Sequence, residues 1–493
     1  MKGAIEEKFD CDVLIAGGGP TGVTLAVLLA RRGVKVVVAE KEADVYPLPR
    51  AAHIDHEGMR ILQEAGAAND VLASSRSAAD YDFLNARGAL LMRFSGADQI
   101  GPGGWPIANM IHQPSVEAAL RRLLAGEANA TLNSRWQLTS FTDDGGGVTA
   151  QIATPDGERT IRARYLVGAD GARSPVREAS GIAFDDLGFE EPWLVVDVLV
   201  DDYSKLPIAN LQICNPDRPT TCVLMGAGRH RWEFMILPGE TAAQVSDDAF
   251  VKKLLEPWNV KGAVRIERKA VYTFRARIAN AWRKGGVLLA GDAAHQTPPF
   301  AGQGMCSGLR DAANLAWKLA AVLRDGAPDT LLDSYQPERA PNLRATIDMA
   351  IMMGRMVCTT SKWSAFVRDT KFRLARALGK LPDGPPAYAP ISDGVILAGS
   401  DEAGSYFPQV LSADGERLDD VLGIGHWLIA REDLAAQKLA PFAASLGRWL
   451  DKAQAEAVLV RPDRYVFGTG TRDSLLAAWR VQTGIGPNQR TLV

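Results

Sequence analysis

The strongest constraint on the fold is a short apolar strand, residues 287–290, that ends beside a carboxylate, Asp292, and leads through a glycine-rich loop into a long helix. Four consecutive apolar residues after a glycine pair predict a strand buried on both faces, as in a parallel sheet. Apolar residues then recur every three or four positions from Met305 to Leu323, which predicts a helix with one buried face. Open α/β sheets bind ligands at the carboxyl ends of their strands, and a helix N terminus offers unpaired N–H groups and positive charge. The loop is therefore a predicted site for an electron-rich ligand.

A Gly-x-Gly-x-x-Gly sequence at residues 17–22 lies between a predicted strand and a predicted helix, the context in which this motif indicates a dinucleotide site. A predicted strand, residues 12–16, precedes it, and a predicted helix, residues 21–32, follows it. A second predicted strand, residues 34–39, ends at Glu40, eighteen positions after the last glycine. This is close to the spacing of about twenty residues expected for the acidic residue of a dinucleotide site. The N-terminal segment is therefore predicted to bind a dinucleotide.

The glycines of this motif have separate predicted roles. Gly17 allows a tight turn, Gly19 lets a pyrophosphate approach the backbone, and Gly22 lets the helix pack closely on the strand. Glu40 is predicted to accept hydrogen bonds from both hydroxyls of an adenosine ribose.

A third strand that ends in a carboxylate and a glycine turn lies at residues 164–177. It follows an alternating segment with two turns, residues 131–163, which predicts a small antiparallel hairpin. The strand brings Asp170 to the sheet edge that already holds Asp292 and the first glycine loop. The sequence thus predicts an α/β fold in which three separated segments converge on one ligand.

The composition argues against several other classes of protein. The chain has 493 residues, too many for one hydrophobic core, so several domains are expected. The formal net charge of −3 argues against nucleic acid or an anionic membrane surface as the main partner. Five scattered cysteines without a Cys-x-x-Cys pair indicate a reducing cytoplasm and predict neither a disulfide frame nor a metal site. The first ten residues lack an apolar core, and glycines interrupt the most apolar run, so neither a signal peptide nor a membrane span is predicted.

The three signatures, at residues 17–22, 168–177 and 290–304, resemble those of the single-component FAD-dependent aromatic hydroxylases, the class A flavoprotein monooxygenases. The segments 231–235 and 308–319 are most similar to the 3-(3-hydroxyphenyl)propionate hydroxylase branch. The resemblance implies a Rossmann-like FAD-binding domain interleaved with an α+β substrate domain that has an antiparallel sheet. It also implies a C-terminal thioredoxin-like domain, as in the larger family members.

The domain boundaries expected on this basis leave the FAD-binding domain discontinuous. It takes residues 1–185 and 275–380, with parts of 55–115 contributing to the substrate domain; residues 186–274 form the substrate-domain sheet, 381–395 a linker rich in Pro, Gly and Asp, and 396–493 the tail. The tail has no cysteine, which excludes a thiol redox function. It is expected to support the fold or a homodimer and to leave the chemical centre untouched.

The resemblance implies FAD as cofactor and NADH or NADPH as electron donor. Its motifs place the ribose on Glu40, the ribityl chain on Asp292 and the isoalloxazine beside the loop that opens the long helix. The cofactor-binding residues that it implies are Gly17, Gly19, Pro20, Thr21, Gly22, Glu40, Lys41, Arg50, Gln113, Asp170, Arg173, Gly291, Asp292, Pro299, Gly302, Gln303, Gly304 and Met305. One departure is Cys306, where many relatives carry Asn. The flavin contacts expected there come from backbone N–H groups. The departure therefore puts in doubt an influence of this side chain on the flavin more than it does flavin binding.

Alternating segments between about residues 190 and 272 predict the antiparallel sheet that covers the flavin. The alternation does not tell which face is inward, so its apolar and amide side chains are candidates for core packing first and for substrate contacts second. The substrate candidates, with one proline from the glycine-rich loop, are Trp193, Gln212, Met225, Phe234 and Pro298. Asp55 stands where related phenol-type hydroxylases place a substrate-facing acid, so it is the predicted catalytic group for the phenol proton.

The implied reaction is hydroxylation of a small phenolic substrate by dioxygen and NAD(P)H through a flavin C4a-hydroperoxide. Two alternatives stay open. One is the same cofactor chemistry applied to Baeyer–Villiger oxidation or to the tailoring of a polycyclic aromatic metabolite. The other is a non-catalytic FAD-binding component of an assembly.

Overall fold

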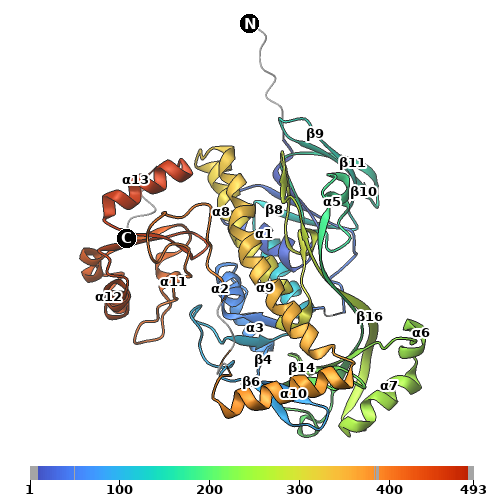
Figure 1. The fold of residues 1–493 in the computed structure, drawn as a ribbon. Coiled ribbons are helices and arrows are strands. Elements are labelled where there is room, and N and C mark those ends of the chain that lie inside the picture. The colour runs from blue at the N-terminus through green and yellow to red at the C-terminus, as the bar shows by residue number, and fades with distance from the viewer. Residues whose placement is uncertain (1–8, 49, 382–383, 385–387, 487–493) are drawn as a thin grey trace.

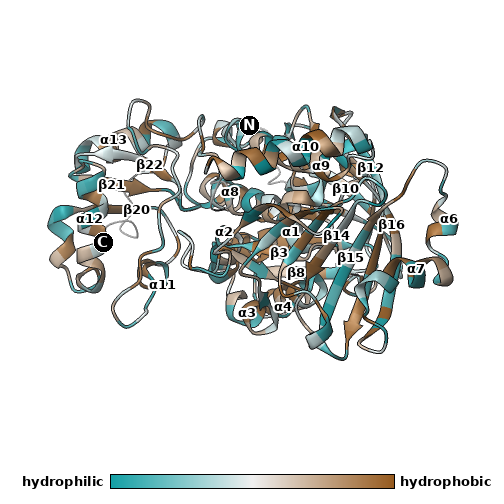
Figure 2. Ribbon diagram, turned by 60° about the horizontal axis from the view of Figure 1, so that its bottom comes forward, coloured by the Kyte–Doolittle hydropathy of each residue, from teal (hydrophilic) through white to brown (hydrophobic). Residues whose placement is uncertain are grey.

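The computed structural model describes residues 9–48, 50–381, 384 and 388–486. Two large sheets with their helices form the main body, and a C-terminal domain lies against one side of it (Figure 1). Hydrophobic segments concentrate in the interior strands, whereas the helices at the two ends of the molecule carry hydrophilic stretches (Figure 2). Part of the predicted linker, residues 382–383 and 385–387, lies outside the described residues.

The first sheet has eight strands in the order β17-β18-β11-β1-β2-β8, with β10 and β9 extending from β11 as an antiparallel hairpin. Strands β18, β11, β1, β2 and β8 run parallel. Ala16 pairs with Gly168 and Ala39, and Gly168 pairs with Leu289, so the carboxyl ends of four strands align. The strands are β1 Cys11–Ala16, β2 Val36–Glu40, β8 Ala130–Ser134, β9 Gln137–Asp143, β10 Val148–Thr154, β11 Gly157–Gly168, β17 Arg283–Lys284 and β18 Val287–Leu289.

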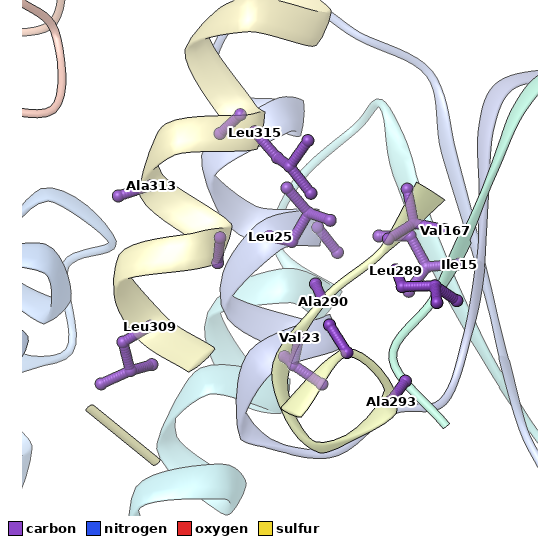
Figure 3. Close-up of a cluster of buried hydrophobic side chains, with 14 of the residues drawn as sticks. Ile15, Val23, Leu25, Val167, Leu289, Ala290, Ala293, Leu309, Ala313 and Leu315 are labelled. Carbon is purple, nitrogen blue, oxygen red and sulfur yellow. The ribbon is translucent and has the colours of Figure 1, made fainter. Parts of the chain in front are cut away.

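The apolar strands predicted from the sequence explain the core of this layer. Ile15, Val167 and Leu289, from three adjacent strands, belong to one cluster with Leu25 of helix α1 and Leu315 of helix α8 (Figure 3). The helices of the main body are α1 Pro20–Ala30, α2 His56–Glu64, α3 Ala68–Ser74, α4 Gln113–Ala125, α5 Pro175–Ala179, α6 Ala242–Val245, α7 Asp248–Leu255, α8 Gly304–Arg324, α9 Tyr335–Val357 and α10 Lys362–Ala377. One expectation was wrong: residues 130–134 do not belong to the antiparallel hairpin but form β8, because they pair in parallel with β2.

The second sheet also has eight strands, in the order β19-β16-β12-β15-β14-β13-β5-β6. Its neighbours are antiparallel except for β13 and β5. The strands are β5 Tyr81–Asn85, β6 Leu90–Phe94, β12 Phe184–Val200, β13 Asn210–Cys214, β14 Thr220–Leu224, β15 Arg229–Met235, β16 Val264–Ala279 and β19 His295–Gln296. The sheet therefore extends past residues 186–274 and recruits β5 and β6 from the N-terminal half. A third, small sheet has the order β3-β7-β4, with β3 His53–Asp55, β4 Arg76–Ser77 and β7 Ala108–Met110.

The C-terminal domain contains an antiparallel three-stranded sheet in the order β20-β21-β22. Its elements are α11 Leu418–Leu422, β20 Trp427–Ala430, α12 Ala443–Lys452, β21 Ala457–Val460, β22 Val466–Gly470 and α13 Arg472–Thr483. Between β20 and α12 lie two short 3-10 turns, Arg431–Ala435 and Ala440–Phe442, with a break between them. Pro441 explains the break, because proline lacks an N–H and starts a helix more readily than it continues one.

The C-terminal domain is joined to the main body by buried charges, contacts that suit the expected role of the tail in supporting the fold. Arg60 of α2 pairs with Asp419 at 2.6 Å, and Arg461 pairs with Glu338 of α9 at 2.5 Å. Trp317 of α8 stacks on Trp479 of α13, with ring centroids 5.9 Å apart. Within the described residues, no helix is long and apolar enough to cross a membrane.

Candidate active site

The glycine loop after β1 has the geometry that its motif predicts. Gly17 adopts φ +105°, which side chains rarely tolerate, and a Cβ atom there would lie 2.4 Å from the Ala169 carbonyl oxygen. A Cβ atom at Gly22 would lie 2.1 Å from the Gly17 carbonyl oxygen, so α1 and β1 pack too closely for any other residue. A Cβ atom at Gly19 would meet no atom within 4 Å, which leaves room for a phosphate against the backbone. Pro20 begins α1 at this point, where its missing N–H costs nothing.

Thr21 links this loop to the segment after β18. A Cβ atom at Gly291 would lie 2.7 Å from the Thr21 hydroxyl oxygen, and one at Gly308 of α8 would lie 2.3 Å from it. Glycines at these two positions therefore let the first turn of α1 pack on both the β18 loop and α8. The structure thus brings the first and third sequence signatures into contact, as predicted.

Glu40 lies at the end of β2 with its carboxylate turned toward the glycine loop. Oε2 accepts the Gly18 N–H at 2.6 Å, and Oε1 accepts the Glu42 N–H at 2.7 Å. The two bonds fix the carboxylate, and each oxygen keeps a lone pair for a ribose hydroxyl. Lys41, the next residue, is exposed.

Arg50 and Gln113, which are 63 positions apart, lie together in the structure. The Gln113 side-chain oxygen accepts the N–H groups of Arg50 at 3.1 Å and Ala51 at 2.8 Å, so it holds this segment at the start of α4. The Arg50 side chain is exposed and lies over the Tyr46 ring, 5.2 Å from its centroid. An exposed guanidinium in this position suits a phosphate of the cofactor or of the electron donor.

Asp170 follows β11 at the same sheet edge. Its Oδ2 accepts the Val176 N–H at 3.0 Å, whereas its Oδ1 is buried without a partner in the described part of the chain. Burial raises the pKa of this carboxyl group. A buried acceptor without a donor fits a ligand hydroxyl or N–H, and the exposed Arg173 lies three residues further on.

The segment after β18 leads into an N terminus of α8 that no described side chain caps. A Cβ atom at Gly304 would meet nothing within 4 Å, and Gly302 turns the loop with φ +65°. Asp292 is exposed to solvent, and the protein packed around it raises its carboxyl pKa by desolvation. Pro299 and Met305 lie on either side of the turn and are half-buried. These residues fit a flavin, because open backbone N–H groups and a helix dipole stabilise its negative charge.

A buried network supports this loop from behind. The Gln303 side chain donates to the Tyr388 hydroxyl at 2.7 Å and accepts from Arg310 at 3.2 Å, so its contribution to a cofactor would come from the backbone. Arg310 also donates to Asp55 at 2.6 Å and to Glu57 at 2.5 Å. All these side chains but Tyr388 are at most 5% exposed.

Asp55, the predicted catalytic group for the phenol proton, lies in surroundings that do not suit a proton acceptor. Asp55 is fully buried, caps α2 by accepting the Gly58 N–H at 2.7 Å, and pairs with Arg310. Burial alone would raise its pKa, but Arg310, together with the neighbouring histidines and the Gly58 N–H, outweighs burial and holds the pKa below its usual range. Such a carboxylate is a weak base, and its contacts favour a role in positioning the loop.

The family of the chain follows from its relatives. A profile described as the FAD binding domain matches residues 10–350, more than half of the chain. A probable NADH-specific resorcinol 4-hydroxylase of Rhodococcus jostii (strain RHA1) is 35% identical, over 93% of this chain and 91% of that protein. A 3-(3-hydroxy-phenyl)propionate/3-hydroxycinnamic acid hydroxylase of Mycobacterium sp. (strain JLS) is 37% identical, over 94% and 83%. The chain belongs to the FAD-dependent aromatic hydroxylases.

The solved structures agree with this family. A ternary complex of aklavinone-11 hydroxylase with FAD and aklavinone is 27% identical and superposes with a TM-score of 0.77 over 97% of this chain and 99% of that chain. The resemblance inferred from the three motifs is therefore confirmed, and FAD is the cofactor of the hydroxylase.

The structure assigns the two faces of the second sheet, which the sequence left open. Trp193 belongs to the core cluster of the FAD-binding half. Its ring lies 5.6 Å from the ring of Phe300, in the loop of residues 290–304 between β18 and α8, called here the flavin loop. Phe234, a predicted substrate contact, lies on the opposite face in a cluster with Val251 of α7. Phe234 therefore packs in the core, the first of its two predicted roles, because side chains alternate along a strand and the inward positions of β15 are Arg231, Glu233 and Met235.

Gln212 lies on the inward face and connects the sheet to the flavin loop. Its amide group donates to the Tyr81 hydroxyl at 2.5 Å and accepts from the Thr221 hydroxyl at 2.7 Å. Tyr81 in turn donates to the Phe300 carbonyl oxygen at 3.0 Å. Met225 and Pro298, the other two candidates, are both buried.

Two inward groups of the hydroxylase were missed as site residues from the sequence. His53 of β3 is half-buried with its Nδ1 3.2 Å from the Gly302 carbonyl oxygen, and burial lowers its pKa. Glu233 of β15 is 6% exposed, and burial raises its pKa to about 7, although Arg231 opposes that effect. Glu233 lies in the segment 231–235, but no local pattern marks it as a site residue, and only the packing of segments far apart in the sequence brings His53 to Gly302.

Proposed function

We propose that the hydroxylase inserts one oxygen atom into a phenolic ring next to an existing hydroxyl group, using dioxygen and a nicotinamide donor. The uncapped N terminus of α8, opposite the inward face of the second sheet, is the observation that carries this proposal. Bound FAD would take up hydride from the donor and pass electrons to dioxygen. The protein's part is to hold the substrate, keep water away and accept a proton.

The residues around the flavin loop exclude water from the reacting ring. Phe300 is 2% exposed and makes edge contacts with the rings of Phe189, Trp193 and Phe274. Together with the buried Pro298, it gives the substrate an apolar neighbour beside the flavin. A dry site protects a reactive oxygen donor from wasteful decay.

His53 is the group best placed to accept the phenol proton. The Gly302 carbonyl can only accept, so the bond between them requires a proton on Nδ1 and leaves the Nε2 lone pair available. A lowered pKa keeps the ring neutral at pH 7. Loss of the phenol proton pushes electron density into the ring, which an electrophilic oxygen donor requires.

NADH is the proposed donor, since a relative along most of the chain is named NADH-specific. The exposed Arg50 and Arg173 flank the cofactor residues and offer cations to the donor's phosphates. The substrate class is a small monocyclic phenol, since the names of the two sequence relatives describe ring hydroxylation of resorcinol and of hydroxyphenyl acids.

Two finer features are part of the proposal. The antiparallel strands β20, β21 and β22 followed by α13 support a thioredoxin-like tail with a short sheet and no cysteine. Cysteines that are all free and mostly buried support a cytoplasmic location.

A substrate panel tests the function. The purified hydroxylase is supplied with FAD, NADH or NADPH, and one member of a set containing resorcinol, 3-(3-hydroxyphenyl)propionate, a cyclic ketone and a polycyclic aromatic. Donor oxidation and product mass are then measured. Gain of one oxygen on a monocyclic phenol supports the proposal. Oxygenation of only the ketone or the polycycle, or donor oxidation that no compound stimulates, would favour the alternatives.

A further inference from the structure

Helix α10 turns apolar side chains to solvent. Trp363 is 72% exposed, Phe366 60% and Leu374 61%, and Leu378, just past the helix end, is 58% exposed. The Trp363 and Phe366 rings stack with centroids 5.8 Å apart. Their spacings of three, eight and four residues place them on one side of the helix, with Thr370 between Phe366 and Leu374, so they form one stripe. An apolar patch of this kind on a soluble protein marks an interaction site.

The opposite face of α10 packs on the main body. The exposure of the stripe is therefore not due to a helix that lacks contacts with the rest of the molecule. Ala365 is 5% exposed, and Phe372 packs against the main core. Arg368 donates to the carbonyl oxygens of Cys214 at 2.7 Å and Met356 at 3.0 Å. Figure 1 shows α10 on the outside of the molecule, across the end that holds β6 and β14.

We propose that α10 of a second copy of this chain covers the stripe, with the two helices antiparallel about a two-fold axis near Thr370. The stripe is nearly symmetric about this residue, since Phe366 precedes it by four positions and Leu374 follows it by four. Trp363 precedes it by seven and Leu378 follows it by eight. Two-fold packing therefore sets Phe366 against Leu374 of the other copy, and Trp363 against Leu378.

The charges beside the stripe favour the antiparallel arrangement. Asp369 and Arg373 lie on one edge of it, and the Asp369 carboxylate also accepts a hydrogen bond from Arg368 of its own helix at 2.8 Å. In an antiparallel pair the same edges of two helices meet in reverse order. Each Arg373 then comes opposite Asp369 of the other copy.

The size of the stripe suits a dimer contact. From the exposed fractions, the four apolar side chains offer about 500 Å² per copy, so two copies reach about 1,000 Å², the area from which specific interfaces begin. An anionic lipid surface is the competing occupant, because Lys371, Arg373, Arg376 and Lys380 are exposed around the same stripe.

Sedimentation velocity on the full-length, FAD-loaded protein tests the contact. The wild type should sediment with twice the chain mass of 53.0 kDa, and Phe366→Lys/Leu374→Lys should sediment as a monomer with unchanged FAD content. Ile208→Lys, at an apolar residue 88% exposed elsewhere, is the matched control and should stay dimeric. A monomeric wild type, or a dimer that survives the double change, would overturn the proposal. Co-sedimentation of a monomeric wild type with phosphatidylglycerol vesicles would assign the stripe to a lipid surface.

A cross-link and a charge exchange test the geometry. Thr370→Cys should form an intermolecular disulfide on mild oxidation, whereas Ser364→Cys, exposed but away from the axis, should not. Arg373→Asp and Asp369→Arg should each weaken the dimer, and the double exchange should restore it. Equal cross-linking of both cysteine variants, or no restoration in the double variant, would refute the antiparallel arrangement.

Discussion

Removal of the Arg310 guanidinium by Arg310→Met should destabilise the protein by about 3–5 kcal/mol, because the change leaves buried carboxylates without their cation. Arg310 donates to Asp55 at 2.6 Å and to Glu57 at 2.5 Å, and all three side chains are at most 5% exposed. Among the described residues, Asp55 then keeps the Gly58 N–H and the Cys306 thiol as donors, and Glu57 keeps a 3.3 Å contact with the Tyr465 hydroxyl. Methionine fills the space of the arginine stem but offers no donor.

The loss of stability caused by Arg310→Met should grow as pH rises, because it comes from a buried carboxylate that has lost its cation. In the wild type the pKa of Asp55 is lowered, so its contribution to stability is present above the unfolded pKa of about 4 and is lost as pH falls. Without Arg310, burial raises the pKa of Asp55 above the unfolded value, and the folded state then loses stability as pH rises. The difference between wild type and variant should therefore be larger at pH 8 than at pH 5.

Urea unfolding followed by circular dichroism at the two pH values measures this difference. Arg344→Met is the matched control, because its pair with Asp348 joins two half-exposed side chains and should contribute at most about 1 kcal/mol. Because Arg310 also holds Gln303, the variant should release FAD more readily than the control. The reasoning fails if Arg310→Met costs no more than Arg344→Met, or if its cost does not change with pH.

The remaining predictions concern the flavin loop, the proton acceptor, the inward carboxyl group and the tail. Gly304→Val should leave thermal unfolding of the apoprotein unchanged but sharply lower FAD content, since its side chain would enter the open space at the start of α8; normal FAD content would contradict this. His53→Gln should lower kcat for a phenol by about 10²–10⁴-fold, with a smaller loss at high pH where the phenol ionises unaided; a loss of equal size at every pH would remove His53 as proton acceptor. Glu233→Gln should gain stability relative to the wild type as pH rises from about 4.5 to 7, because the raised pKa of Glu233 penalises the folded state over that window; parallel stability curves would disprove it. A fragment that ends at Lys380 should bind FAD weakly and unfold more easily, because it exposes Trp317 and leaves the buried Arg60 without Asp419; a fragment as stable as the full chain would show that the tail is independent.

The sequence was sufficient where function depends on local backbone geometry. Gly17, Gly19 and Gly22 serve a turn, an open approach and a close contact within six residues, so the spacing alone specified their roles. The parallel strands before Asp170 and Asp292 were equally predictable, because continuous apolar runs indicate burial on both faces.

Contacts between residues far apart in the sequence could not be predicted. The alternation in β15 predicted two faces but not which one meets the flavin, and only the structure shows that Phe234 lies on the other face. Arg310 and Asp55 are 255 positions apart, and Gln303 and Tyr388 are 85 apart, so no local pattern indicates their bonds. The ion pair with Arg310 is what changes Asp55 from a candidate base into a buried support.

An oxygen-label experiment tests the central claim most directly. The FAD-loaded hydroxylase is given NADH and resorcinol under ¹⁸O₂ in ordinary water, and the product is examined by mass spectrometry; the reverse labelling, ordinary dioxygen in H₂¹⁸O, is run beside it. We predict a ring-hydroxylated product that carries one labelled oxygen in the first case and none in the second. A product labelled from water, or NADH oxidation that yields only hydrogen peroxide with every phenol offered, would contradict the assignment of this chain as a phenol hydroxylase.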